Sequence, residues 1–166
     1  MLVWDTSPIL HAGRIDRLDV LGDIASGWGR NVTTAAVAQE LEREDVTVPE
    51  WLGVVHVDGL DEIIALGEWL QRVSAGRRDR GEATVFAWAE VHGAIAIVDD
   101  KDARMAAQRA GLAAHGTLWV IARAVVAERI TCAGAVGFVD AMLSSGARYP
   151  FGYGGFVPWA EAQGLL

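Results

Sequence analysis

Four acidic positions, far apart in the sequence, lie where apolar segments end or beside apolar helix stripes. Asp5 and the acidic run 99–102 each follow an apolar segment, while Glu40 and Glu82 fall on expected helices, next to the apolar stripe of each. Carboxylates brought together repel one another unless a cation lies between them, and Mg²⁺ or Mn²⁺ prefers oxygen ligands. The pattern therefore indicates metal-dependent phosphodiester chemistry.

Most of these carboxylates also have an ordinary structural explanation. Asp5 could cap the helix that follows it, and Glu40 could pair with Arg43 on a solvated face. Glu82 could complete a capping box with Asp79. Because burying a charge without a partner is costly, a bound cation would explain all the positions together. Both interpretations stay open at this point.

Within the acidic run, the sequence does not fix which residue would bind the metal. Asp99, Asp100 and Asp102 are each candidates. Asp99 or Asp100 could instead cap the following helix, where a negative charge is favoured.

The elements that must position these residues alternate between strand and helix. We expect strands at 2–5, 94–98 and 112–114 and an extended segment at 46–58. We expect helices at about 8–11, 15–25, 34–44, 60–73, 82–92, 101–110, 117–129, 133–145 and 158–163, with turns or loops at 27–30, 74–81 and 146–157. The segment 94–98 is wholly apolar, as a parallel strand buried on both faces should be. The alternation predicts an α/β fold, a three-layer α/β/α sandwich with a central parallel sheet.

In such a sheet the carboxyl ends of the strands share one edge, where ligands bind. Thr6, Ser7 and Thr117 are expected near this edge, either as local helix caps or as oxygen ligands and phosphate contacts. His115 has no partner at a recognisable spacing for a catalytic triad, so we interpret it as a surface loop residue. No glycine-rich nucleotide-binding loop occurs.

The composition predicts a single domain over residues 1–166. The apolar fraction is 52%, and seven tryptophans support a real core. The one cysteine, Cys132, excludes an internal disulfide, and without neighbouring His or Cys a zinc site is not expected. Because no apolar run approaches the ~20 residues of a membrane span and the first residues lack the basic stretch of a signal peptide, we expect a cytoplasmic protein without membrane contact.

The net charge of −8 argues against a protein that binds nucleic acid mainly through a basic surface. Four arginines, however, cluster just before Glu82: Arg72, Arg77, Arg78 and Arg80. They could form a solvated loop or a rim that contacts phosphates, and the sequence leaves both hypotheses open.

Several short motifs, in a fixed order, resemble those of PIN-domain proteins. They are Asp5-Thr6-Ser7-Pro8-Ile9-Leu10, Val37-Ala38-Gln39-Glu40-Leu41, Asp79-Arg80-Gly81-Glu82-Ala83 and Ile97-Val98-Asp99-Asp100-Lys101-Asp102-Ala103-Arg104, followed by Gly111-Leu112 and Gly116-Thr117. The resemblance covers residues 2 to about 145. It is closest to the prokaryotic branch whose third acidic position lies in a Gly-Glu-Ala helix start, a branch related to the toxin ribonucleases of toxin–antitoxin pairs.

The resemblance implies a PIN-like sandwich and a metal-dependent endoribonuclease that cuts RNA as the toxin of such a pair. By position, Asp5, Glu40, Glu82 and Asp99 would form the catalytic cluster and bind one or two Mg²⁺ or Mn²⁺ ions, with Asp100 the next candidate ligand. A homodimer and a cognate antitoxin protein are further expectations, and the apolar helices 60–73 and 117–129 are candidates for the dimer face. The chain departs from the family in having Thr33-Thr34 where a Val-Pro pair is expected, and its segment near 146–157 has no role in the resemblance.

The sequence is also compatible with two other functions. One is a catalytically silent α/β module that binds a protein partner, which the acidic charge also fits. The other is a structure-specific DNA nuclease, which ranks lower because the chain lacks the helical arches and basic extensions that would hold a branched duplex.

Overall fold

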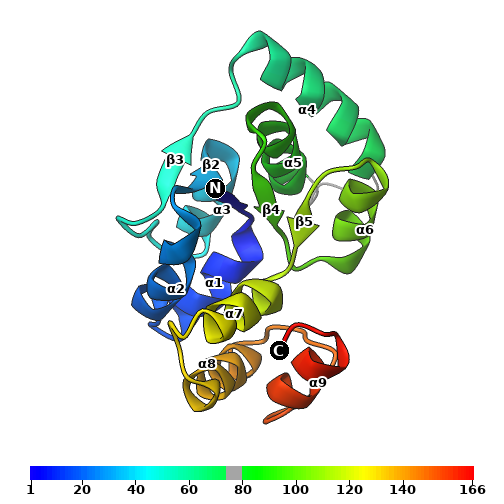
Figure 1. Cartoon of the computed structure of the whole chain (residues 1–166). Coiled ribbons are helices and arrows are strands. Elements are labelled where there is room, and N and C mark those ends of the chain that lie inside the picture. The colour runs from blue at the N-terminus through cyan, green and yellow to red at the C-terminus, as the bar shows by residue number, and fades with distance from the viewer. Residues whose placement is uncertain (74–79) are drawn as a thin grey trace.

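The computed structural model describes residues 1–73 and 80–166, and strand and helix alternate along these residues from the first strand to the helix that follows the last one (Figure 1). The strands are β1 (Leu2–Trp4), β2 (Asn31–Thr34), β3 (Gly53–Val55), β4 (Ile95–Ile97) and β5 (Ala114–His115). The helices are α1 (Thr6–Arg14), α2 (Leu18–Ala25), the 3-10 helix η1 (Ser26–Trp28), α3 (Ala35–Arg43), α4 (Leu60–Val73), α5 (Arg80–His92), α6 (Lys101–Arg109), α7 (Thr117–Val126), α8 (Cys132–Ser144) and α9 (Phe156–Ala162). The predicted α/β class is confirmed.

The five strands form one parallel sheet in the order β3-β2-β1-β4-β5. β1 is the central strand, and its Val3 is in register with Val32 on one side and Ala96 on the other. All three residues of β1 are inaccessible to solvent, as a strand covered on both faces requires. The central parallel sheet predicted from the sequence is therefore present.

Helices cover both faces of this sheet. The connections from β1 to β2 and from β2 to β3 run in one direction along the sheet, and the connection from β4 to β5 runs in the other. Because parallel crossovers are right-handed, α1, α2 and α3 lie on one face and α4, α5 and α6 on the other. α7 packs against α2, and α8 and α9 lie at the end of the molecule away from α4 (Figure 1). The predicted three-layer sandwich is confirmed.

α5 is the helix that lies across the middle of the sheet, in contact with β1, β2 and β4. From Gly81 to Ala89 every residue except Glu82 is buried. A helix that is apolar on all sides belongs in a core, and the alanines on α5 allow the sheet to approach closely. The first turn of α5, which includes Glu82, is thereby fixed at the edge of the sheet.

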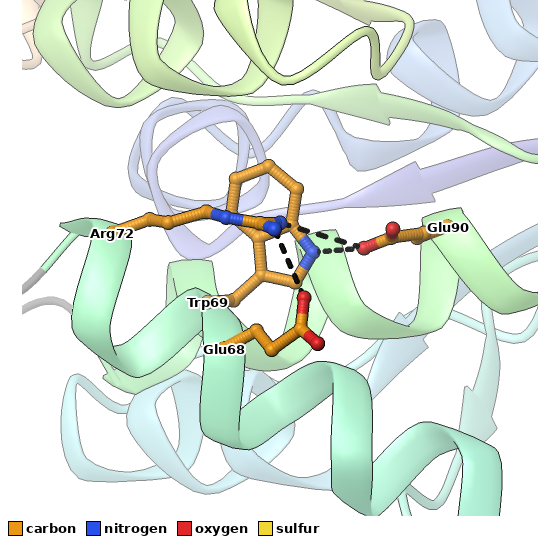
Figure 2. Close-up of polar contacts among 4 residues, drawn as sticks. All are labelled: Glu68, Trp69, Arg72 and Glu90. Carbon is orange, nitrogen blue, oxygen red and sulfur yellow. Dashed lines mark hydrogen bonds and ion pairs between the residues drawn. The ribbon is translucent and has the colours of Figure 1, made fainter.

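α4 is attached to α5 through Trp69, which is completely buried. The indole Nε1 donates a hydrogen bond to Oε2 of Glu90 at 2.5 Å, and the Arg72 guanidinium lies 4.9 Å from the centroid of the Trp69 ring (Figure 2). Arg72 also pairs with Glu68 at 2.9 Å. The opposite side of α4 exposes Leu60, Ile63 and Ile64 to solvent.

β2 is the strand that the sequence did not predict as a strand. We expected a helix to begin near Thr34, directly after the turn at 27–30, because Asn and Thr do not make an apolar run. The residues of β2 are nevertheless buried, since each polar group finds a partner. Asn31 accepts a hydrogen bond from Trp4 Nε1 at 2.9 Å, Thr33 donates to the carbonyl of Trp4 at 2.8 Å, and Thr34 bonds Thr84 at 2.7 Å.

Several helix boundaries also differ from the prediction. α1 begins at Thr6, before the expected start near Pro8, and continues to Arg14. α2 begins at Leu18 because Asp16 has a φ of 54°, which breaks the helix expected from residue 15. α7 ends at Val126, and Glu128, with a φ of 56°, turns the chain before the expected end at 129. No helix of the described residues is long and apolar enough to cross a bilayer.

Candidate metal and nucleic-acid site

Asp5 and Asp99 lie on either side of the point where the winding of the sheet reverses. Asp5 directly follows β1, and Asp99 lies two residues beyond the end of the neighbouring strand β4. The backbone N–H of Asp5 donates to the carbonyl of Ile97 at 3.0 Å, which holds the two strand ends together. In open α/β sheets such a reversal leaves a crevice at the carboxyl ends of the strands, where ligands bind.

The carboxylate of Asp5 is buried in this crevice, and its pKa is shifted. Only 5% of the residue is exposed, and burial raises its pKa to about 7, with the charges of Glu40 and Asp99 adding to the effect. The backbone N–H groups of Thr6 and Ser7 partly oppose this rise. Asp5 occupies the N-cap position of α1, and its side chain forms no capping hydrogen bond with a described residue.

Glu40 reaches the same edge from α3. Thr34 caps α3 by accepting a hydrogen bond from the N–H of Val37 at 3.3 Å. The Thr6 hydroxyl donates to Oε2 of Glu40, which joins α3 to α1. Among the ion pairs of the described residues there is none between Glu40 and Arg43, so the alternative explanation for Glu40 is not realised.

The contact with Glu40 explains why a glycine, Gly81, precedes Glu82 in the sequence. A Cβ atom at Gly81 would lie 2.8 Å from Oε1 of Glu40, so the carboxylate rests against the bare backbone of α5. Glu82 follows in the first turn of α5 and is half-buried. Gly81 therefore brings the start of α5, with Glu82, up to the carboxylate of Glu40.

Asp99 is held by the N-terminus of α7. Its Oδ1 accepts a hydrogen bond from the N–H of Thr117 and its Oδ2 one from the Thr117 hydroxyl, both at 2.8 Å. Burial raises the pKa of Asp99, while the bonds from Thr117 and the charge of Arg104 oppose the rise. A Cβ at Gly116 would lie 3.1 Å from Oδ1, so this carboxylate also rests against a glycine.

The other two acids of the run are exposed. Asp100 is exposed and caps α6, because its Oδ1 accepts a hydrogen bond from the N–H of Ala103 at 2.8 Å. Asp102 is exposed in the first turn of α6. The capping role left open for Asp99 or Asp100 belongs to Asp100.

Some predicted positions fall outside the described residues. They are Arg77 and Arg78 of the arginine cluster and Asp79 of the suggested capping box. Arg80 is described and lies exposed in the first turn of α5, and Arg72 contacts Trp69 and Glu68. Arg72 is thus part of the contact between α4 and α5.

Three residues near the crevice were not singled out as site residues from the sequence: His11, Arg104 and Tyr149. The charge of Asp99 acts on both His11 and Tyr149, although burial is the larger influence and lowers the pKa of His11 and raises that of Tyr149. His11 Nδ1 is hydrogen-bonded to Ser145 Oγ at 2.9 Å across 134 residues of sequence. Only folding could bring the C-terminal segment here. Arg104, one turn after Asp100, donates to the carbonyl of Val98 at 2.7 Å.

His115 is not the surface loop residue that we expected. It belongs to β5, is half-buried and stacks on Trp119 with the ring centroids 3.9 Å apart. The prediction was wrong because β5 extends one residue beyond the strand expected at 112–114.

The chemistry of the carboxylates fits a divalent cation. Asp5, Glu40 and Asp99 are close enough for the other two charges to raise the pKa of Asp5, and all their donor atoms are oxygens, which Mg²⁺ and Mn²⁺ prefer. Among the residues that the structure describes, no three His, Cys, Asp or Glu side chains already form a metal-binding group. Thr6 and Thr117 instead orient Glu40 and Asp99.

Comparison with known proteins identifies a family. A family model described as a PIN domain matches residues 1–152, which include all five strands and the helices from α1 to α8. No curated protein and no solved structure matches the chain.

Proposed function

The chain belongs to the PIN-domain family, whose members are generally nucleases that use divalent metal ions, and on this premise we propose that it is a metal-dependent endoribonuclease. The observation that best supports the proposal is the position of Asp5 and Asp99 on both sides of the switch point of the sheet. Glu40 lies close enough to influence Asp5, so three carboxylates face one crevice. A cation bound there would favour the charged form of these carboxylates.

In this proposal the metal ligands are Asp5, Glu40, Glu82 and Asp99. Asp100 is the next candidate because it is adjacent to Asp99. It ranks below the other four because it is exposed and caps α6. One or two bound Mg²⁺ or Mn²⁺ ions would supply an activated water and neutralise charge on the phosphate and on the leaving oxygen. No side-chain nucleophile is required.

The hydrogen bonds around the crevice keep the carboxylates in place. Thr117 binds both oxygens of Asp99, so that this carboxylate cannot rotate freely. Thr6 holds Glu40, and Arg104 is held by the carbonyl of Val98 beside Asp99. Fixed carboxylates do not have to reorganise when an ion and a phosphate bind, which favours catalysis.

The test is cutting of single-stranded RNA in Mg²⁺ or Mn²⁺ by the wild type and by Asp5→Asn and Asp99→Asn. We expect each substitution to lower the rate more than about 100-fold, because even residues that only support metal ligands contribute 10–100-fold. Asp102→Asn, an equal change of charge at an exposed position within the same run, serves as the control and should cut like the wild type. An Asp5 or Asp99 variant as active as wild type would remove that residue from the site.

A catalytically silent module remains the rival proposal. It is favoured by the hydrogen bonds that already occupy Glu40 and Asp99 and by the net charge of −8. Such a module would cut no RNA and would gain no stability from Mn²⁺, so both measurements separate it from a nuclease.

For the biological role we propose the toxin component of a toxin–antitoxin pair, acting in the cytoplasm on RNA. The support is the resemblance of the motifs around Asp5, Glu40, Glu82 and Asp99. Induced expression in a bacterium should stop growth, and Asp5→Asn should not. Normal growth with active protein present would contradict the toxin role without contradicting the nuclease.

A homodimer is also proposed, and of the two helices suggested from the sequence only α4 suits it. Most apolar residues of α7 are buried in the chain's own core, so that helix is not free to form a dimer face. α4 exposes Leu60, Ile63 and Ile64. Sedimentation of the wild type and of Ile63→Glu tests this face, and a monomeric wild type would rule it out.

A further inference from the structure

A cavity of about 330 Å³ opens beside Glu40. It lies between the start of α3, the first turn of α5 and the segment 56–58 that precedes α4. Glu40 also belongs to the carboxylate crevice through Thr6 and Asp5, so its side chain borders both spaces. A polymer bound across Glu40 would therefore occupy the cavity and the crevice at once.

Four polar side chains that line this cavity have unused hydrogen-bonding groups. Gln39, Arg43, His56 and Arg80 form no hydrogen bond or ion pair with a described residue. Some other arginines of the described residues are engaged, as Arg72 is with Glu68 and Arg14 with Glu44. Two unpaired guanidinium groups in one cavity of a protein with a net charge of −8 are available for an external anion.

The rest of the cavity wall suits a flat, mostly apolar ring. Val57 and Leu66 are half-buried and supply an apolar surface. Thr34 and Thr84 are hydrogen-bonded to each other at 2.7 Å, and Thr84 also donates to the carbonyl of Gly81 at 2.6 Å, so they form a fixed part of the wall. The volume is at the lower end of the ~300–1,000 Å³ typical of small-ligand sites.

We infer that this cavity binds one nucleotide of a single-stranded RNA substrate, next to the phosphodiester bond at the carboxylates. The inference rests on the proposed ribonuclease function. Arg43 and Arg80 pair with the phosphates on either side of this nucleotide, and the base packs against Val57 and Leu66. Gln39 donates to the edge of the base, and the Asp58 carboxylate at the rim accepts from a base amino group or from the ribose 2′-hydroxyl.

The first test measures binding of a short fluorescein-labelled single-stranded RNA in Mg²⁺, in an Asp5→Asn background so that cutting does not interfere. Arg43→Gln combined with Arg80→Gln should weaken binding about tenfold or more, since charged hydrogen bonds are lost. The slope of log affinity against log salt should become shallower by roughly 0.7 for each phosphate contact removed. An unchanged affinity and slope would overturn the inference.

The matched control combines Arg109→Gln with Arg123→Gln. It removes the same charge from exposed positions on α6 and α7, and Arg109, like Arg43, lies in the last turn of its helix. This control should keep the affinity within about twofold, with the salt slope of the parent. An equal loss in the control would mean that net charge alone is responsible, and it would also overturn the inference.

The second test separates the base from the phosphates. Ala36→Leu adds side-chain volume at a residue that lines the cavity. We expect about tenfold weaker binding with an unchanged salt slope, because no phosphate contact is removed. Thermal unfolding of the variant shows that it is folded. Binding equal to that of the parent would exclude a base in the cavity.

These outcomes are distinct from failure of the proposed function. If the wild type cuts RNA while the arginine and Ala36 variants bind as the parent does, the cavity assignment is wrong and the nuclease stands. If the wild type cuts no RNA and the parent binds none, both proposals are wrong.

Discussion

Asp5 lies in an environment that disfavours its charge. It is almost inaccessible to solvent, and Glu40 and Asp99 are near it, so burial and repulsion together raise its pKa to about 7. Without a cation, a large fraction of Asp5 side chains is protonated near neutral pH. A divalent ion would reverse this preference, because it favours the charged form of each carboxylate.

The first prediction concerns stability against pH in the absence of metal. Because the folded pKa of Asp5 lies above the unfolded value of 3.8, the folded state binds its proton more tightly, and stability falls as pH rises from about 4 to about 7. A shift of this size corresponds to a loss on the order of 4 kcal/mol. The raised pKa of Asp99 acts in the same direction.

Urea unfolding in EDTA across this pH range measures the effect. Asp5→Asn cannot titrate at this position, so its stability should fall less steeply than that of the wild type. Identical pH profiles for the two proteins would show that Asp5 is not held in a charge-disfavouring environment.

The second prediction concerns Gly81, whose missing side chain makes room for Glu40. In Gly81→Ala the new Cβ would collide with the carboxylate, which must move, since the contact would be 2.8 Å. We expect RNA cutting to drop about tenfold or more, while the fold persists because alanine favours helix by about 1 kcal/mol over glycine.

Gly67→Ala is the control for this change. Gly67 lies inside α4, and a Cβ there meets nothing within 4 Å. It should gain helix stability and keep full activity. If Gly81→Ala cuts RNA as fast as Gly67→Ala, the position of Glu40 does not matter for catalysis.

At the scale of elements, α4 is attached to the molecule mainly through its contact with α5. Trp69 is the largest buried side chain on α4, and Glu90 and Arg72 satisfy its indole and cover its ring (Figure 2). The third prediction follows from this arrangement. Trp69→Ala should lower the free energy of unfolding by about 3–5 kcal/mol, the range for removal of a buried tryptophan.

Chemical denaturation measures this loss, and the neighbouring Leu70→Ala provides the comparison. Leu70 is 38% exposed, so its replacement should lower the free energy of unfolding less than the replacement of Trp69. A loss for Trp69→Ala no larger than that for Leu70→Ala would show that α4 is not anchored through its tryptophan.

Elements with a strong local pattern could be predicted from the sequence, and those stabilised by distant partners could not. The apolar strand β4 and the amphipathic helix α4 were both expected. β2 was not, because its Asn31 and Thr33 are buried only by virtue of hydrogen bonds to Trp4, more than 25 residues away. A window of sequence contains no information about such a partner.

The same distinction applies to the site. Asp5 and Asp99 could be placed at the shared edge because each follows an apolar segment, and the structure brings both to the switch point. The approach of Tyr149 to Asp99 and the hydrogen bond between His11 and Ser145 depend on how the C-terminal segment packs. The sequence also could not show which acid of the run lies near Asp5. In the structure Thr117 donates a hydrogen bond to Asp99, while Asp100 caps α6.

At the scale of the whole molecule, the fourth prediction is that Mn²⁺ stabilises the wild type against heat. A ligand that binds only the folded state, at 100 times its dissociation constant, adds ~2.7 kcal/mol. Asp99→Asn should lose most of this gain. In metal-free buffer it should also be more stable than wild type at neutral pH, because one repelling charge is gone.

Thermal unfolding with and without millimolar Mn²⁺ measures both effects, with Asp102→Asn as the control. The control should show the full shift of the wild type. If Mn²⁺ shifts none of the three proteins, the metal-dependent mechanism is wrong and the silent binding module becomes the better proposal.

The central position of β1 has a consequence for how the chain folds during synthesis. β1 leaves the ribosome before either of its neighbours has emerged, and its partner β4 follows only after about 90 further residues. Until then its apolar edge has no β4 to pair with, and pairings between strands so far apart in sequence form slowly. Nascent chains of this protein should therefore depend on chaperones until β4 emerges, and those cut short before residue 95 should aggregate.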